Sequence, residues 1–189
     1  MAKKKRSIPQ QIFLWVFQIV IVVLFAFVLV YFFGQTRACI GQSMSTTIEG
    51  GDAVLLDGLS YKLGNPKRND VIAFQLNGNR EGASSIKRIL GLPGETIQIK
   101  DGMIYIDGEI YLEKKDYPAM TDAGLAEEPI TLGTNQYFVL GDNRNNSEDS
   151  RYADVGVVSG KNIEGKVWFV LSPSDHMGLV KSKKREDIA

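Results

Sequence analysis

The chain has 189 residues, enough for one domain or two small lobes beside a membrane anchor. Its 22 basic and 22 acidic residues balance, but residues 7–180 carry 14 Lys and Arg against 20 Asp and Glu, because the cations gather at the two ends. A net-acidic body argues against nucleic-acid binding, and the basic ends suit either anionic lipid or simple solvation. Cys39 is the only cysteine, which excludes an internal disulfide and a thiolate metal site.

The first feature along the chain is an apolar run at residues 12–33, which contains one polar side chain and no charge. As a helix it spans about 33 Å, the thickness of the hydrocarbon core of a bilayer. A cleavable signal peptide would have a shorter apolar stretch followed by small residues, whereas this run ends in aromatic residues 31–33. A lipoprotein signal is disfavoured because Arg37 lies where a small residue should precede Cys39. We therefore expect one transmembrane helix over residues 12–33.

The charges around this helix predict its orientation. Four cations precede the apolar run within residues 1–11, and Arg37 is the only cation in the stretch just after it. Positive charge is enriched on the cytoplasmic side of membrane helices. The sequence thus predicts a cytoplasmic basic tail at residues 1–11, with the rest of the protein outside the cytoplasmic (plasma) membrane.

Beyond residue 38 the pattern predicts β-structure. Short apolar stretches alternate with Gly, Asp and Asn, and outside the anchor no apolar repeat of 3.6 residues extends over any length. The clearest predicted strands are residues 53–56, 71–76, 85–90, 136–140 and 166–171. The fold class is therefore mostly β: a transmembrane helix followed by an antiparallel sheet body.

A small lobe is expected within this body. Residues 96–112 contain Asp101-Gly102 and Asp107-Gly108, the pairs that two-residue hairpin turns prefer because both positions need positive φ. Residues 113–135 have little periodicity and are expected to form loop. The predicted organisation is a main β domain at residues 38–95 and 136–175, an inserted hairpin and loop lobe at 96–135, and a basic C-terminal tail at 176–189.

Motifs for metals and cofactors are missing from the sequence. It has no Cys/His cluster, no phosphate-binding Gly-rich loop and no EF-hand spacing. The segment GDNRNNSEDSR at 141–151 is rich in oxygen ligands, but two interleaved arginines do not suit a calcium site. We expect no cofactor and no metal.

A serine nucleophile would need a base, and the chain has one histidine, His176, near its C-terminus. The alternative base is a lysine kept neutral by burial. Lys87 in SSIKRILGLPGE lies on a predicted strand among apolar neighbours and is the best-placed candidate. By chemistry alone the signal is weak, since strand lysines are mostly exposed.

The order of four segments strengthens the case for Lys87 as the base. GQSMSTTI, GGDAV, IKRILGLPGE and GDNRNNSEDSR, in this order after a membrane anchor, resemble the bacterial type I signal peptidases, the membrane-anchored Ser/Lys proteases of peptidase family S26. The resemblance runs from the anchor to about residue 172 and is closest to the single-span, Gram-positive type of member. It implies the signal-peptidase β fold, which is related to that of the self-cleaving LexA-like repressors.

The resemblance implies a catalytic pair and a substrate cleft. Ser43 would be the nucleophile and Lys87 the general base, while Met44 and Gly41 would belong to the cleft. Some members have a serine at the position of Gly41, whose hydroxyl helps to bind the oxyanion. Here the backbone N–H of Ser43, with a water or another hydroxyl, would have that task.

The resemblance also implies that the last motif, GDNRNNSEDSR at 141–151, supports this catalytic pair. Ser147 would hydrogen-bond to the lysine amine and orient it. Asp149 and Arg151 would pair with each other and brace the site. Asp142 and Asn143 complete the motif behind the reacting groups.

Further matches are structural, and one position departs from the family pattern. The family implies a structural role for Asp52, and Arg88 and Gly94 would hold the lysine strand and the turn after it. Thr46 stands where the family usually has proline. Because proline restricts its own φ and the residue before it, its absence is expected to loosen the loop that presents Ser43.

The implied function is removal of N-terminal signal peptides from exported pre-proteins at the outer surface of the cytoplasmic membrane, near the secretion translocon and at Ala-x-Ala-like sites. An alternative is a catalytically impaired homologue that acts as a membrane-tethered binding or scaffolding module. Self-cleaving repressors carry a DNA-binding head where this chain has a membrane span. A plain membrane-tethered β module would leave the two long motifs unexplained.

Overall fold

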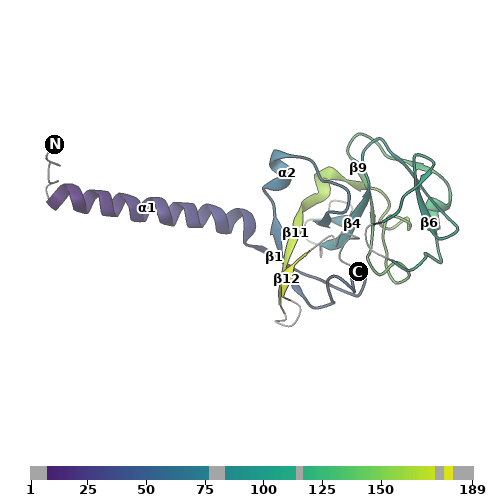
Figure 1. Ribbon diagram of the computed structural model, residues 1–189, viewed down its shortest axis with the longest axis horizontal. Coiled ribbons are helices and arrows are strands. Elements are labelled where there is room, and N and C mark those ends of the chain that lie inside the picture. The colour runs from purple at the N-terminus through teal and green to yellow at the C-terminus, as the bar shows by residue number, and fades with distance from the viewer. Residues whose placement is uncertain (1–7, 77–83, 114–116, 173–176, 181–189) are drawn as a thin grey trace.

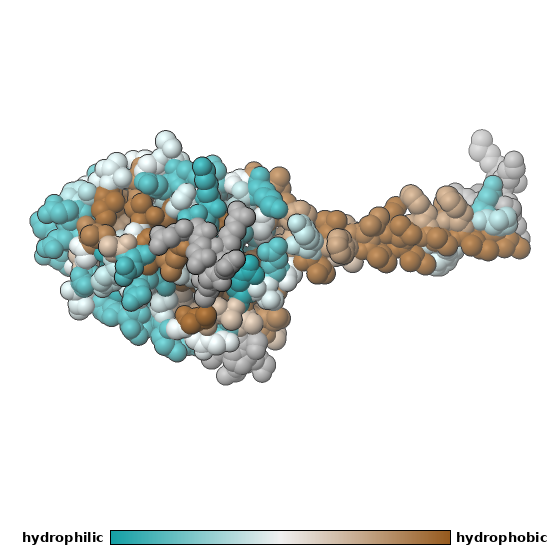
Figure 2. Space-filling view, turned by 180° about the vertical axis from the view of Figure 1, so that it is seen from behind, coloured by the Kyte–Doolittle hydropathy of each residue, from teal (hydrophilic) through white to brown (hydrophobic). Residues whose placement is uncertain are grey.

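The computed structural model describes residues 8–76, 84–113, 117–172 and 177–180. Its first element is α1 (Ile8–Phe33), a 26-residue helix of about 39 Å that projects from the body (Figure 1). None of its side chains is buried, and apolar residues cover most of its length (Figure 2). Among the described residues α1 is the one helix long and apolar enough to cross a membrane, by length and composition.

The chain passes from the anchor straight into the body. Gly34 is followed by β1 (Gln35–Ala38), which pairs antiparallel with β2 (Ala53–Asp57). The N–H of Gly58, just after β2, donates to the carbonyl of Phe32 at 3.2 Å. These bonds tie the end of the anchor to the edge of the sheet.

The main sheet is antiparallel, in the order β1-β2-β11-β3-β4-β9-β10, with β12 paired to β11. Its other strands are β3 (Val71–Phe74), β4 (Ser85–Gly91), β9 (Gln136–Leu140), β10 (Val158–Ser159), β11 (Ile163–Ser172) and β12 (Gly178–Leu179). Two short helices, α2 (Ser60–Leu63) and η3 (Gly160–Asn162), connect strands. The mostly-β prediction is confirmed. β12 lies within the segment expected to be a tail, and His176 lies outside the described residues.

A second sheet, in the order β7-β6-β5-β8, forms a lobe at the end of the body away from α1 (Figure 1). Its elements are β5 (Thr96–Lys100), β6 (Met103–Ile106), β7 (Glu109–Ile110), η2 (Gly124–Glu127) and β8 (Ile130–Thr131). Both predicted Asp-Gly turns are present, with φ of 53° and 73° at 101–102 and 52° and 84° at 107–108. The segment 113–135, expected to be loop, also contains η2 and β8. Each is too short to give a periodic signal.

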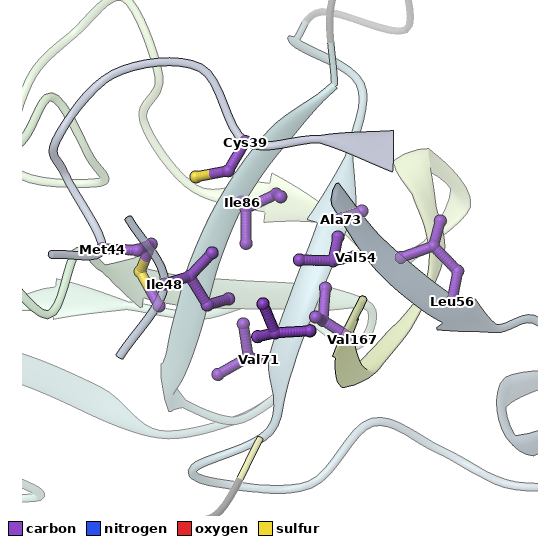
Figure 3. Close-up of a cluster of buried hydrophobic side chains, with 10 residues drawn as sticks. Cys39, Met44, Ile48, Val54, Leu56, Val71, Ala73, Ile86 and Val167 are labelled. Carbon is purple, nitrogen blue, oxygen red and sulfur yellow. The ribbon is translucent and has the colours of Figure 1, made fainter. Parts of the chain in front are cut away.

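Strand β4 connects the three buried apolar clusters of the body. Ile86 belongs to the cluster that also contains Met44 and Ile48 (Figure 3). Leu90 belongs to the cluster of the lobe, and Ile89 belongs to a third cluster. Gly91 ends the strand where a Cβ would lie 2.7 Å from the side chains of both Ile97 and Leu132. A glycine there lets the lobe pack directly against β4. The strand that carries Lys87 is therefore packed against all three clusters.

Candidate active site

The candidate nucleophile lies on a tight loop anchored in the core. The N–H of Ser45 donates to Gln42 O at 3.1 Å, and the N–H of Ile48 donates to Met44 O at 2.9 Å. Met44 and Ile48 are fully buried in the cluster of Figure 3. Burial of each side chain contributes about 1.5–3 kcal/mol to the free energy of unfolding. This packing fixes the loop and leaves Ser43 half-buried at the surface.

Met44, which was expected to line the substrate cleft, lies in the core in this structure. Its side chain is 0% exposed, and its Sδ accepts a hydrogen bond from the N–H of Asp142 at 3.4 Å. The loop turns Ser43 outward and therefore directs the next side chain into the core. Gly41 is exposed and has φ +84°, and Ile40 and Gln42 on either side of it line the cleft.

The candidate base reaches the nucleophile. Lys87 is in β4, between β3 and β9, and its side chain is 7% exposed. Its Nζ lies 2.7 Å from Ser43 Oγ, in hydrogen-bonding contact. Burial lowers the pKa of Lys87 below its usual value, and the charges of Asp149, Cys39 and Glu148 oppose this only in part. The lysine thus has both the position and the environment of a base.

Asn143 of the last motif is hydrogen-bonded to the loop that carries Ser43. Its N–H donates to Ser43 O at 3.0 Å, and its Nδ2 donates to Gln42 O at 3.1 Å and Ser45 Oγ at 2.9 Å. Gly141 permits this close approach, because a Cβ there would lie 2.5 Å from Ser43 O. The last motif therefore holds the loop through both the backbone and the side chain of Asn143.

Ser147 departs from its expected role. It lines the same cleft as Ser43 and Lys87, but among the described residues its buried Oγ has no hydrogen-bond partner. The expected bond to the lysine amine is not formed in this structure. The amine is instead directed at Ser43, and Ser147 Oγ packs against Gly141.

Two buried ion pairs support the site. Arg88 is bidentate to Asp142, with Nε–Oδ1 of 2.7 Å and Nη2–Oδ2 of 2.6 Å. Arg151 is bidentate to Asp149 at 2.8 and 2.9 Å, and Asp149 also accepts from the N–H of Gly141. All four charged side chains are 4% exposed or less. The lysine strand and the last motif are thereby joined in one buried network.

The other expected structural residues lie at turns. Asp52 is buried, and its Oδ2 accepts from the N–H of Glu49 at 2.8 Å. Gly94 has φ +87°, and its N–H donates to Leu132 O at 3.0 Å. Both fix chain direction rather than face the dyad.

Sequence reasoning missed two further contacts to Asp142. From the lobe, Tyr117 donates its hydroxyl to Asp142 at 3.1 Å, and from the nucleophile loop Thr47 Oγ1 donates to the same carboxylate. Tyr117 lies in the segment that has no periodicity, so the sequence carries no signal for this contact.

Thr46 has φ +89°, in the left-handed region that a β-branched residue rarely adopts. Proline, with φ locked near −65°, cannot take this backbone conformation. The loop therefore follows a path different from the one that the usual family residue would impose.

We expect Thr46→Gly to raise the free energy of unfolding by about 1 kcal/mol, because it removes left-handed strain. Thr46→Pro should lower both stability and activity. Chemical denaturation of the purified full-length chain in detergent measures the first effect. Thr46→Ala is the matched control, since it keeps a Cβ and should change little. A stability loss in Thr46→Gly would contradict the strain argument.

The dyad opens into a cleft of about 630 Å³. Its lining is more polar than apolar, with the apolar part supplied by Ile40, Leu76 and Val155 together with the ring of Tyr152. Among the described residues no group of three or more His, Cys, Asp or Glu side chains could hold a metal ion.

These features define a class of protein: an antiparallel β body on an apolar helix, with a serine hydroxyl against a buried lysine amine. The family model "Signal peptidase, peptidase S26" matches residues 12–172. Signal peptidase I T of Bacillus subtilis (strain 168) is 34% identical over 187 residues, covering 95% of this chain and 94% of that protein. Probable signal peptidase I-2 of Synechocystis sp. is 32% identical, covering 95% and 82%.

A crystal structure of a signal peptidase I from Enterococcus faecalis V583 is 33% identical, with a TM-score of 0.43, and covers 55% of this chain and 97% of that one. On the family model and the relatives, the chain belongs to the S26 signal peptidase family. It is a membrane-anchored serine endopeptidase with the function of a signal peptidase I.

Proposed function

We propose that the chain cleaves signal peptides by a Ser/Lys mechanism, with Ser43 as nucleophile and Lys87 as general base. The observation that carries the proposal is the 2.7 Å contact between Lys87 Nζ and Ser43 Oγ in a buried setting. A neutral amine there takes the Ser43 proton as Oγ attacks the scissile carbonyl. The resulting lysinium then protonates the leaving amine of the mature protein.

Hydrolysis of the acyl-enzyme follows the reverse proton path. Lys87 accepts a proton from water, the water oxygen attacks the acyl carbon, and Ser43 Oγ leaves and regains its proton. The backbone N–H of Ser43 stabilises the oxyanion in both steps. Neither Asp149 nor Arg151 touches the reacting atoms, and their role is to hold the last motif against the loop.

We further propose the membrane arrangement. The cationic residues before α1 stay in the cytoplasm and the β body lies outside. Because β1 follows α1 directly and pairs with β2, Ser43 stays close to the outer membrane surface. A precursor held in the bilayer by its apolar segment, near the translocon, presents its cleavage site at this height. We propose that it binds as an extended strand and that Ala-x-Ala-like sites are preferred.

The test is cleavage of a purified pre-protein by the full-length chain in detergent, followed by N-terminal sequencing of the product. The proposal requires cleavage after a small residue at the end of the signal peptide. A Ser43→Ala preparation serves as the control for contaminating proteases. Failure of the wild type to cleave several precursors up to alkaline pH would instead support the impaired homologue that binds or scaffolds.

A further inference from the structure

One wall of the cleft is formed by Tyr152, which directly follows the last motif. Its N–H donates to Asp149 O at 2.9 Å, and its carbonyl accepts from the N–H groups of Val155 and Gly156 at 3.1 and 2.8 Å. The backbone of Tyr152 is therefore fixed on both sides. What remains to be set is the direction of its side chain.

That direction is set from the lobe. Tyr152 Oη donates to Asp122 Oδ2 at 2.9 Å, while Asp122 Oδ1 accepts from the N–H of Gly124 at 2.8 Å. The carbonyl of Asp122 accepts from Arg151 Nη1 at 2.9 Å. The Gly124 N–H and the Tyr152 hydroxyl lower the pKa of Asp122, so its carboxylate is ionised and oriented at neutral pH. Asp122 thus connects the lobe to the cleft wall.

Neighbouring contacts make this connection continuous. Asn145, which also lines the cleft, accepts from the N–H of Thr121 at 3.0 Å and donates to Ala119 O at 3.1 Å. The N–H of Leu125 donates to Arg151 O at 2.7 Å. The lobe segment 119–125 therefore runs along the last motif and holds two cleft-lining side chains.

The polar end of Tyr152 is occupied by this contact, which leaves the ring as the surface that faces the cleft. An aromatic side chain with its hydroxyl bound at one end presents apolar area on its faces. Leu76 and Val155 line the same cleft and pack against the third apolar cluster. These three side chains therefore contribute apolar surface to the cleft that also contains Ser43 and Lys87.

We propose that Asp122 is a positioning residue for substrate binding: through Tyr152 it holds an apolar subsite, formed with Leu76 and Val155, that receives one apolar side chain of the peptide. This inference rests on the proposed function, because it assigns the ligand of the cleft as an extended peptide. An extended peptide presents alternate side chains to such walls. The fixed ring improves binding because it loses less conformational freedom when the peptide arrives.

Binding can be measured without catalysis in a Ser43→Ala background. The probes are fluorescent peptides that span a signal-peptide cleavage site, with Ala, Leu or Phe placed in turn at each flanking position. Ser43→Ala should bind Leu or Phe better than Ala at one position. Adding Asp122→Ala or Tyr152→Phe should raise Kd for that peptide about threefold to tenfold, the effect of one hydrogen bond.

The controls separate positioning from general damage. Asp122→Asn still offers an acceptor oxygen and should retain most of the affinity. Glu127→Ala removes a carboxylate of the lobe that lies at the end of η2, outside segment 119–125, and should leave Kd unchanged. In the double variant Asp122→Ala with Tyr152→Phe, Kd should be no higher than in the weaker-binding single variant, since both substitutions remove the same contact between Tyr152 and Asp122. In the Ser43-containing enzyme the loss should appear in KM rather than in kcat or its pH profile.

Several results would overturn the inference. These are an unchanged Kd in Asp122→Ala, additive effects of the two substitutions, equal losses for every peptide, or a loss confined to kcat. None of these outcomes concerns the ability of the wild type to cleave a pre-protein, so failure of the inference is distinguishable from failure of the proposed function.

Discussion

Lys87→Met should lower kcat about 10⁴-fold, because it removes the amine that contacts the Ser43 hydroxyl. Ser43→Ala should be at least as damaging, and the double variant should be no worse than the more damaging single variant, since nucleophile and base act as one unit. Lys87→Arg should also be inactive, because a guanidinium cannot be deprotonated to act as a base. Steady-state cleavage of a pre-protein at fixed pH gives each value.

The pH dependence of kcat/KM provides a second test of Lys87→Met. Burial lowers the pKa of Lys87, and only the neutral amine is active, so kcat/KM should rise with pH through that lowered pKa. The residual rate of Lys87→Met should lack this rise. Lys166→Met is a matched control, because Lys166 is 39% exposed on strand β11 of the same sheet and pairs with Asp70. Substantial cleavage by Lys87→Met would rule out the proposed base.

Burial of this lysine also affects stability. Because its pKa is lower in the folded chain than in the unfolded chain, the unfolded chain binds more protons between these two pKa values. The free energy of unfolding therefore rises with pH across this window. The lysine that performs the chemistry thus weakens the fold at neutral pH, and the packing of Ile86, Ile89 and Leu90 on the same strand offsets that effect.

The elements predictable from sequence are those with a strong local signal. The anchor was visible as an uninterrupted apolar run, and the hairpins of the lobe were visible through their two Asp-Gly turns, where positive φ is required. The strands at 53–57, 85–91 and 136–140 followed from short apolar runs between turn residues. In each case a few neighbouring residues determine the backbone.

What the sequence left open depends on contacts between distant segments. The inward direction of Met44 results from a loop clamped by Asn143, about a hundred positions later. The contacts of Tyr117 and Asp122 with the last motif arise in a segment that has no periodic pattern. Such contacts are made by single side chains across the fold, so no local pattern encodes them.

The pair Arg88–Asp142 is where such a contact should matter most for stability. Asp142→Ala should lower the free energy of unfolding by about 3–5 kcal/mol, because it leaves the guanidinium of Arg88 buried without its carboxylate. Burial alone would lower the pKa of Arg88, and the two hydrogen bonds to Asp142 more than reverse this. Denaturation of the full-length chain in detergent, followed through tryptophan fluorescence, to which Trp168 in β11 contributes, measures the change.

Two variants distinguish loss of this buried pair from loss of any ion pair. Lys166→Met breaks a partly exposed pair and should change stability by less than about 1 kcal/mol. Replacing both partners, with Arg88→Met and Asp142→Leu, should restore part of the loss, because no buried charge is then left unpaired. If Asp142→Ala unfolds within 1 kcal/mol of the wild type, or the double variant is less stable than the single one, the pair does not hold the lysine strand as argued. If the variants have the expected order of stability, the ion pair between Arg88 and Asp142, which joins β4 to the last motif, is a main source of stability at the site. The residue that performs the chemistry, Lys87, is the direct neighbour of Arg88 on the same strand.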